Sequence, residues 1–385
     1  MKKMLSISTL LILLGLSAAV GQGKFSGYMF GDYYYNVMRD ANITNLKNVA
    51  SPAGTTAYQA FQFRRIYFTY DNDISDQFTS RLRLEADQTA SNGVPASGDM
   101  LVGTTTSAGK VSMFVKDAYL MWKNVFSGSN LIFGVQPTPA FDVSETAWGY
   151  RSLEKTIMDL RGIVPSRDLG VSLKGKITDD GMINYWAMFA DGSGNVVETD
   201  KYKRYYAHIQ FKPTVNLQAT LYVDYKDAAN IVNSYTKSTV NNAAMTTALF
   251  IGYSEPFSYN IGVEGFLQTT ANALKDTSAK SYSDLSGMGF SVFGSYYIIP
   301  ELAVVARYDN YSPSSDDNSK DPAHYGTGTA GYLSRNLIIA GLSWKVDKNV
   351  SIMPNVYYET YEAPKGGTTP DPSITARLTV YYIFL

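Results

Sequence analysis

The chain has 385 residues, of which 45% are hydrophobic, 17% charged and 14% aromatic, with 33 basic against 34 acidic side chains. Ordinary soluble domains contain about 25% charged residues, so this sequence is poor in charge, and its balanced charge argues against a nucleic-acid partner. The absence of cysteine excludes disulfides, thiolate metal sites and cysteine nucleophiles, and the two histidines offer little for catalysis, so the composition argues against most enzymes.

The first segment has the layout of a secretory signal peptide. Lys2 and Lys3 precede an apolar run, and small residues follow at positions 17–19. A short basic region, an apolar core and a small-residue cleavage site define such a peptide. We predict that residues 1–21 are a cleaved signal peptide and that residues 22–385 form a single exported domain. No later segment is an apolar run of the roughly 20 residues that a spanning helix needs.

Beyond residue 23, hydrophobic side chains recur at every second position. Strand side chains alternate between two faces, so this period predicts β-strands with one apolar and one polar face. In residues 78–87 one face is mainly apolar, and the other carries four charges: Arg81, Arg83, Glu85 and Asp87. Such a pattern recurs in about sixteen segments, near residues 24–37, 59–70, 77–88, 111–123, 130–137, 168–177, 182–191, 202–212, 216–226, 244–254, 257–268, 285–298, 301–310, 334–345, 349–360 and 374–385.

The connections between these segments alternate between short and long. Short turns at one rim and long loops at the other are typical of bacterial outer-membrane barrels. Aromatic pairs near the predicted strand ends, such as Tyr185-Trp186 and Tyr205-Tyr206, favour the membrane interface. We therefore predict an all-β fold, a transmembrane antiparallel up-and-down β-barrel of about 16 strands in contact with outer-membrane lipid. A soluble two-sheet sandwich is the alternative.

The third long connection, residues 138–167, is the longest in the chain. Structureless loops beyond about 12–15 residues are uncommon unless they are functional. Its aromatic and aliphatic side chains, Trp148 and Leu153 among them, favour packing against a wall, so we predict that this third loop folds into the lumen as a constriction; an external solvated loop is the alternative. Its charged residues are Asp142, Glu145, Arg151, Glu154, Lys155, Asp159, Arg161 and Arg167.

The charged faces of the predicted strands must point to the water-filled interior. An Arg facing lipid at mid-depth costs roughly 2–4 kcal/mol. Lys116 then falls on the lipid face, which a bulge or snorkelling would explain, and the pair Arg64-Arg65 breaks the alternation and predicts a β-bulge. The predicted pore-lining residues are Arg81, Arg83, Glu85, Asp87, Asp117, Tyr119, Lys174, Asp224, Glu264 and Arg307.

Motifs for catalysis or cofactor binding are not visible in the sequence. His208 lies on the polar face of a predicted strand, where a wall residue is the simpler interpretation than a base. His324 lies in an acidic loop without the spacing of a calcium loop. We therefore expect no enzyme, no metal site and no cofactor.

Several segments of the first 215 residues resemble a known family. They are Phe63-Arg64-Arg65-Ile66-Tyr67-Phe68, Lys116-Asp117-Ala118-Tyr119-Leu120, Phe133-Gly134-Val135-Gln136-Pro137-Thr138-Pro139 and Arg161-Gly162-Ile163-Val164-Pro165-Ser166-Arg167-Asp168-Leu169-Gly170-Val171. Their order and spacing resemble the phosphate-selective porin O and P family and related porins of Bacteroidetes-like bacteria. The resemblance implies sixteen-stranded barrels, commonly homotrimers, with an inward third loop. Anion selectivity in that family's best-known members depends on basic ladders and a lysine cluster, and the lysine cluster has no match here.

Together these patterns predict an outer-membrane porin. Its water-filled lumen would let small hydrophilic solutes or ions, including anions such as phosphate, diffuse passively. A structural or adhesive barrel with a closed lumen and partner-binding loops is the alternative. An apolar-solute transporter would want an N-terminal plug, and residues 22–24 are too few for one.

Overall fold

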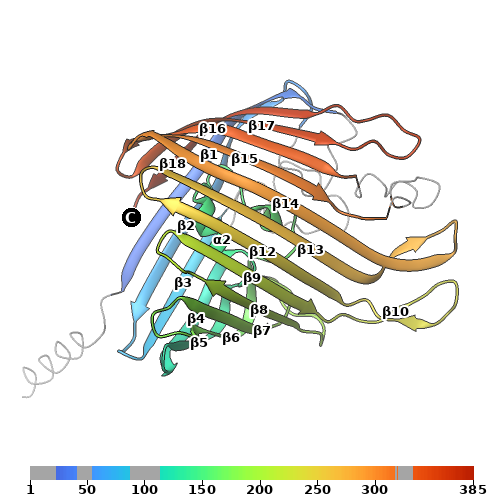
Figure 1. The fold of residues 1–385 in the computed structure, drawn as a ribbon, viewed down its shortest axis with the longest axis horizontal. Helices are drawn as coiled ribbons and strands as arrows, with labels where there is room; N and C mark the ends of the chain where they lie inside the picture. The colour runs from blue at the N-terminus through green and yellow to red at the C-terminus, as the bar shows by residue number, and fades with distance from the viewer. Residues whose placement is uncertain (1–22, 41–53, 87–112, 317–318, 320–332) are drawn as a thin grey trace, which may run out of the picture.

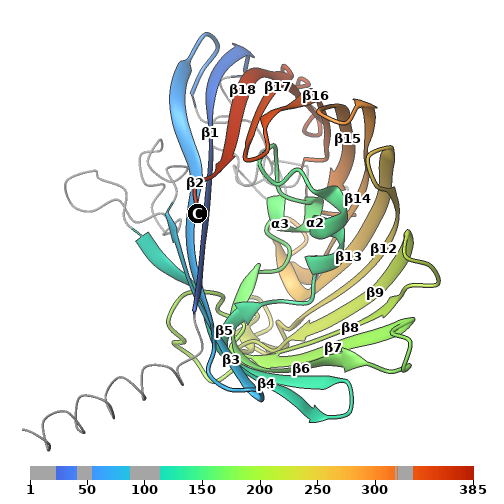
Figure 2. The ribbon, with the colours of Figure 1, turned by 90° about the vertical axis from the view of Figure 1, so that its left-hand side faces the viewer.

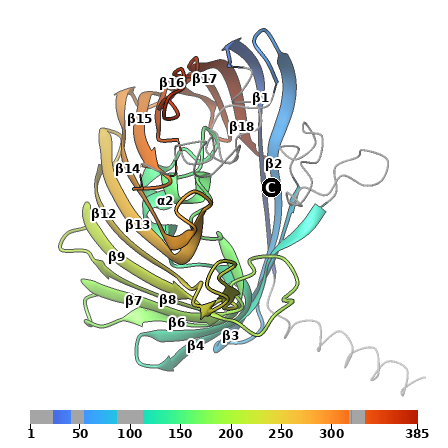
Figure 3. The same ribbon diagram turned by 90° about the vertical axis from the view of Figure 1, so that its right-hand side faces the viewer.

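The computed structural model describes residues 23–40, 54–86, 113–316, 319 and 333–385 (Figure 1). The predicted signal peptide, Asp87 and His324 lie outside these residues. Within them, the chain forms one closed antiparallel barrel whose strands enclose the two short helices (Figures 2 and 3). The predicted barrel and its sixteen strands are confirmed.

The barrel strands follow one another in chain order around the wall. The last strand pairs with the first, with Tyr34 opposite Arg377, and this pairing closes the sheet. The strands are β1 (Lys24–Met38), β2 (Gln59–Asp73), β3 (Phe78–Ala86), β4 (Met113–Phe126), β5 (Ser129–Pro137), β6 (Arg167–Lys176), β7 (Ile183–Ala190), β8 (Arg204–Phe211), β9 (Leu217–Lys226), β12 (Ala244–Glu255), β13 (Tyr259–Asp276), β14 (Ser281–Ile299), β15 (Leu302–Ser312), β16 (Arg335–Asp347), β17 (Val350–Tyr361) and β18 (Ser373–Ile383).

Burial alternates along the strands as the sequence period requires. On β9, Leu221 and Val223 are exposed on the outer face, whereas Tyr222 and Asp224 are buried on the inner face. Exposed apolar side chains recur on the outer face of nearly every strand, from Phe133 on β5 to Leu378 on β18. An apolar outer band with a polar interior is the arrangement that lipid demands. None of the helices in the described ranges is long and apolar enough to cross a bilayer.

Two loop predictions are corrected by the strands. The sequence places a long loop at residues 269–284, but β13 and β14 continue as a paired hairpin as far as Asp276 and Ser281. This extension is rich in Thr, Ser, Asn and Ala, a composition that is common in loops. The connection after β9 contains a two-stranded sheet of its own, β10 (Ile231–Val232) and β11 (Thr239–Val240). Both project from the long-loop rim (Figure 1).

Aromatic placement is corrected as well. Several residues predicted to lie at the lipid interface face the interior instead and are almost fully buried: Tyr34, Trp186, Tyr206 and Tyr357. In adjacent aromatic pairs, one member points outward and the other inward, because neighbouring strand positions face opposite sides. Each pair therefore contributes one ring to the interior.

Two β-bulges place extra charge inside the barrel. In the β1–β2 ladder Phe30 pairs with Arg65 and Gly31 pairs with Phe63, so Arg64 is left without a partner position in β1. This extra residue confirms the predicted bulge. In the β3–β4 ladder Arg83 pairs with Asp117 and Leu84 pairs with Val115, so Lys116 is the extra residue of the second bulge. A bulge rotates the local strand direction, and Lys116 thereby reaches Glu85 on the inner side, with its Nζ 3.0 Å from the carboxylate.

The assignment of faces on β3 predicts a difference between two substitutions. Leu82 is 43% exposed on the apolar outer face, whereas Thr79 shares the face of Arg81. We expect Leu82→Arg to reduce the yield of folded barrel strongly, since a lipid-facing Arg costs roughly 2–4 kcal/mol, and Thr79→Arg to leave the yield near that of the wild type. Detergent-resistant folded protein on unboiled gels measures both. Equal yields would contradict the assignment.

Candidate functional site

The third loop crosses the interior of the barrel. It leaves the wall at Pro137, forms α2 (Asp142–Trp148) and α3 (Ile157–Leu160), and rejoins the wall at Arg167, the first residue of β6. Figure 2 shows both helices inside the ring of strands. Helix α2 contacts β12 and β13, and α3 contacts β14. The predicted inward fold of this loop is confirmed, with Arg167 on the strand rather than on the loop.

Apolar packing holds the loop against one side of the wall. Trp148 and Leu153 are completely buried in a cluster with Phe250, Phe293 and Val305. The rings of Trp148 and Phe293 meet edge to face, with their centroids 5.2 Å apart. Burying one such side chain contributes about 1.5–3 kcal/mol. The docked loop is therefore strongly favoured over a loop that extends into water.

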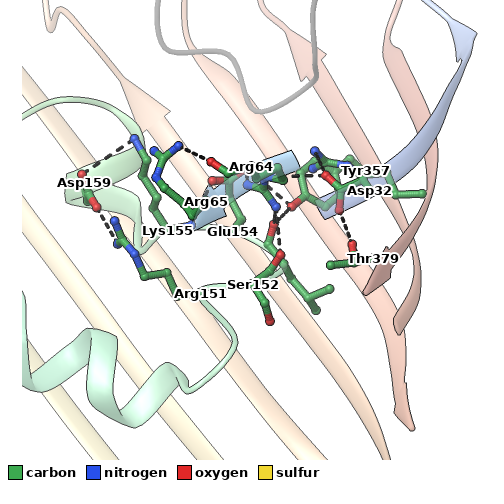
Figure 4. A network of polar contacts seen from close by, with 12 residues as sticks. Asp32, Arg64, Arg65, Arg151, Ser152, Glu154, Lys155, Asp159, Tyr357 and Thr379 are labelled. Carbon is green, nitrogen blue, oxygen red and sulfur yellow. Dashed lines mark hydrogen bonds and ion pairs between the residues drawn. The ribbon is translucent and has the colours of Figure 1, made fainter. Parts of the chain in front are cut away.

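A polar network fixes the middle of the loop to β1, β2 and β17 (Figure 4). Arg64 donates hydrogen bonds to the backbone carbonyls of Ser152, at 2.9 Å, and of Leu153. Its guanidinium also lies 3.2 Å from the carboxylate of Glu154. The Tyr357 hydroxyl donates to the Leu153 carbonyl as well. The bulge at Arg64 thus supplies the main anchor of the loop.

Further contacts follow the loop around the wall. Ser144 of α2 donates a 2.8 Å hydrogen bond to Glu264 on β13. Arg307 on β15, paired with Asp309, donates to the Lys155 carbonyl. Arg161 lies 2.8 Å from Glu359 on β17, and both side chains are fully buried. The loop is therefore held by contacts with β13, β15, β17 and β2.

Charges remain on the side of the loop that faces the opposite wall. Arg151 pairs with Glu145 and, at 2.8 Å, with Asp159, while Lys155 lies 3.9 Å from Asp159. We call these four residues the loop charges. Two are basic and two are acidic, so the loop carries no net charge at this point.

The wall formed by β2, β3, β4 and β6 carries a second group. This second group of charges consists of two clusters, each with two basic side chains around one carboxylate. Arg65 and Lys116 pair with Glu85, and Arg83 and Arg167 pair with Asp117. We call these six residues the wall charges. Arg151 lies within electrostatic range of Glu85, Lys116 and Arg167, so the loop charges and the wall charges are neighbours on the inner side of the barrel.

Cavities lie around the loop. One of about 460 Å³ separates Glu145 and Arg151 from Tyr28 on β1. Another, of about 610 Å³, lies between Lys155 and Asp159 and the strands that carry Arg204 and Gln268. A third, of about 620 Å³, lies at the short-turn end beneath α2 and reaches Arg81 and Lys174. The loop thus narrows the interior without filling it.

The predicted site residues fall into groups with different surroundings. Arg81, Tyr119, Asp142 and Lys174 line the cavity beneath α2, and Lys155 and Asp159 line the 610 Å³ cavity. Others lie on the inner side but are covered, so they hold the loop or the wall together instead of facing open water: Glu85, Asp117, Glu154, Arg161, Asp224, Glu264 and Arg307.

Sequence reasoning missed several important residues. The alternation indicates a bulge at Arg64 and Arg65 but no anchoring role, and it assigns Lys116 to the lipid face. Tyr357 and Glu359 are separated from their loop partners by about 200 positions, with Tyr357 to Leu153 spanning 204. Period-two alternation indicates the face of a residue but not its distant partner. Within the described part of the chain, no cluster of His, Asp and Glu side chains is arranged to hold a metal ion.

Two loop carboxyls make the docked loop sensitive to strong acid. Burial raises the pKa of Glu154, but Arg64, Arg377 and Lys155 together lower it by more, so that pKa lies below its usual range. The pKa of Asp159 is likewise lowered, because Lys155 and Arg151 outweigh burial. A depressed folded-state pKa stabilises the docked loop at neutral pH, and this contribution is lost only as the pH falls through that lowered value.

We therefore expect the ion pairs of Glu154 and Asp159 to persist at neutral and mildly acidic pH, and the single-channel conductance to change below about pH 4, where ordinary carboxyls titrate. Glu154→Gln removes the ion pair with Arg64 and should give altered conductance already at pH 7. Bilayer recordings across the pH range make the measurement. A conductance that stayed unchanged down to about pH 2 would contradict this assignment.

Comparison with known structures supports the fold. The channel DcaP of Acinetobacter baumannii superposes with a TM-score of 0.66 at 13% identity, over 94% of this chain and 97% of that chain. OprB of Pseudomonas putida superposes with a TM-score of 0.66 at 10% identity, over 96% of each chain. An anion-selective porin from Comamonas acidovorans gives 0.60 at 11%, over 94% of this chain and 100% of that one. No protein-family model and no curated sequence matches the chain.

The chain therefore has the fold of outer-membrane porins and channels. The superpositions extend over nearly all of both chains in each comparison. At identities of 10–13% they establish the architecture and not the solute.

Proposed function

We propose that this protein is an outer-membrane porin, a water-filled channel through which small hydrophilic solutes or ions diffuse passively into the periplasm. The observation that carries the proposal is the third loop, which is held to one side of a closed barrel and presents the loop charges toward the wall charges. A narrow, charged, water-lined passage selects solutes by size and by charge.

The balance of charge favours anions. The wall charges comprise four bases and two acids, whereas the loop charges comprise two of each. The excess of two positive charges therefore resides on the wall. Charge acts most strongly where water is confined, so we infer a moderate preference for anions, phosphate included.

The proposal includes export by the predicted signal peptide, residence in the outer membrane and assembly as a homotrimer. A trimer form of the outer membrane protein OmpT of Vibrio cholerae superposes with a TM-score of 0.54 at 13% identity, which supports the oligomeric part. A channel of this kind needs no cofactor and performs no catalysis.

Swelling of liposomes that contain the purified protein tests the proposal. We expect swelling in small neutral sugars, at rates that fall as the sugars become larger. The alternative is a closed structural or adhesive barrel with partner-binding loops. It would give no swelling even with the smallest solutes.

A further inference from the structure

The cavity beneath α2 has a lining unlike that of the other two. It lies at the short-turn end of the lumen, has a volume of about 620 Å³, and is bounded by strands from β3 to β9. Basic, amide and aromatic side chains line it together. Pockets that bind organic solutes combine aromatic surface with a few convergent polar groups.

Positive charge predominates in this cavity. Its lining contains four bases, Arg81, Lys174, Lys176 and Lys212, and one acid, Asp142. Arg81 is matched by Asp71, with a 2.7 Å hydrogen bond from Nε to the carboxylate. The Lys174 Nζ lies 3.4 Å from the carboxylate of Asp142. The lysines at the rim therefore leave an excess of positive charge that attracts an anionic solute.

The Trp186 ring orients the Lys174 side chain, which stays accessible in the cavity. Its ammonium lies 3.9 Å from the centroid of the Trp186 ring, a cation–π contact. The Lys174 side chain nevertheless remains 44% exposed. Trp186 is only 3% exposed, and the edge of its ring meets His208. The ring is thereby fixed and orients the lysine without hiding it.

Amide and hydroxyl side chains also line this cavity. Gln210 donates a 3.0 Å hydrogen bond to Gln218, which leaves each amide with further donor or acceptor capacity. Tyr119, which pairs with Arg81 in the β3–β4 ladder, adds a ring and a hydroxyl group. A simple inorganic anion needs only the cations. Neutral amides and aromatic rings are suited to the hydroxyl groups and carbon skeleton of an organic solute.

We propose that this cavity is a binding subsite for hydroxylated organic anions, such as acidic sugars or hydroxycarboxylic acids, with Lys174 contacting the carboxylate. The proposal rests on the proposed function and specifies a solute class for the same channel. The subsite lies on the exit side of the third loop, so a solute that has passed the loop charges meets it next.

Reversible block of the ion current tests the proposal. Glucuronate added on the short-turn side of a bilayer containing the channel should reduce the potassium chloride current in a saturable manner. Glucose at the same concentrations should leave the current unchanged. Inorganic phosphate separates the two anion classes: if it competes as strongly as glucuronate, the cavity is a simple anion site and the proposal is overturned.

Substitutions locate the block. Lys174→Gln should raise the half-blocking glucuronate concentration at least about fivefold, equal to roughly 1 kcal/mol. Trp186→Phe, which keeps a ring but alters the support of Lys174, should raise it less. Lys348→Gln removes an exposed lysine at the turn between β16 and β17, outside this cavity, and should leave the block unchanged. A conducting channel with unchanged block in Lys174→Gln overturns the subsite, whereas the absence of any current overturns the proposed function.

Discussion

Replacement of residues 147–157 by a short glycine–serine linker should raise the single-channel conductance severalfold while the barrel stays folded. This segment includes the buried side chains of Trp148, Leu153 and Ile157 and carries most of the contacts of the loop with β15 and β17. The hydrogen-bonded ladder of the wall is continuous without it. Arg64 and Arg307 lose their loop partners, but in a widened lumen water solvates them.

A point substitution provides the matched comparison. Arg64→Gln removes the anchor to Ser152, Leu153 and Glu154 but keeps the apolar cluster around Trp148. We expect a folded channel with a noisier current and a smaller rise in conductance than the deletion gives. The migration of unboiled protein on a gel is the check that both variants are folded. An unchanged conductance in the variant that lacks residues 147–157 would show that the third loop is not the narrowest point of the lumen.

Neutralising the excess wall charge should remove the preference for anions. In the double variant Lys116→Gln and Arg83→Gln, Glu85 keeps Arg65 and Asp117 keeps Arg167, so no buried carboxylate loses all of its basic partners. Removal of one partner from a buried pair costs several kcal/mol, and this design avoids that cost. The reversal potential in a potassium chloride gradient should shift toward cation selectivity.

Exposed lysines outside the lumen supply the control. Lys280→Gln with Lys348→Gln also removes two positive charges, from the exposed tip of the β13–β14 hairpin and from the turn between β16 and β17, and should leave the reversal potential unchanged. Glu145→Gln should shift selectivity further toward anions. Glu154→Gln acts differently, because Glu154 faces Arg64 and holds the loop. If the wall double variant retained the wild-type reversal potential, the wall charges would not set the selectivity.

Period-two alternation was sufficient to predict the strands and their faces. Leu221 and Asp224 illustrate why: a lipid face must be apolar and an aqueous face polar, so each strand carries its own orientation. The inward third loop was predictable for a similar reason, since Trp148 and Leu153 cannot remain in water at low cost.

Other features depend on long-range pairing, which alternation does not encode. Lys116 reaches Glu85 only because a bulge turns it inward, and Arg161 meets Glu359 across 198 positions. The hairpin at residues 269–284 was mistaken for a loop because its small polar residues are common in turns. The wall to which the loop docks could not be predicted from the sequence at all.

Single-channel recording in planar bilayers shows whether a water-filled passage runs past the third loop. We expect large, stable, discrete conductance steps with a reversal potential on the anion side in a potassium chloride gradient. A folded, detergent-resistant barrel that inserts into the bilayer and produces no steps would contradict this expectation.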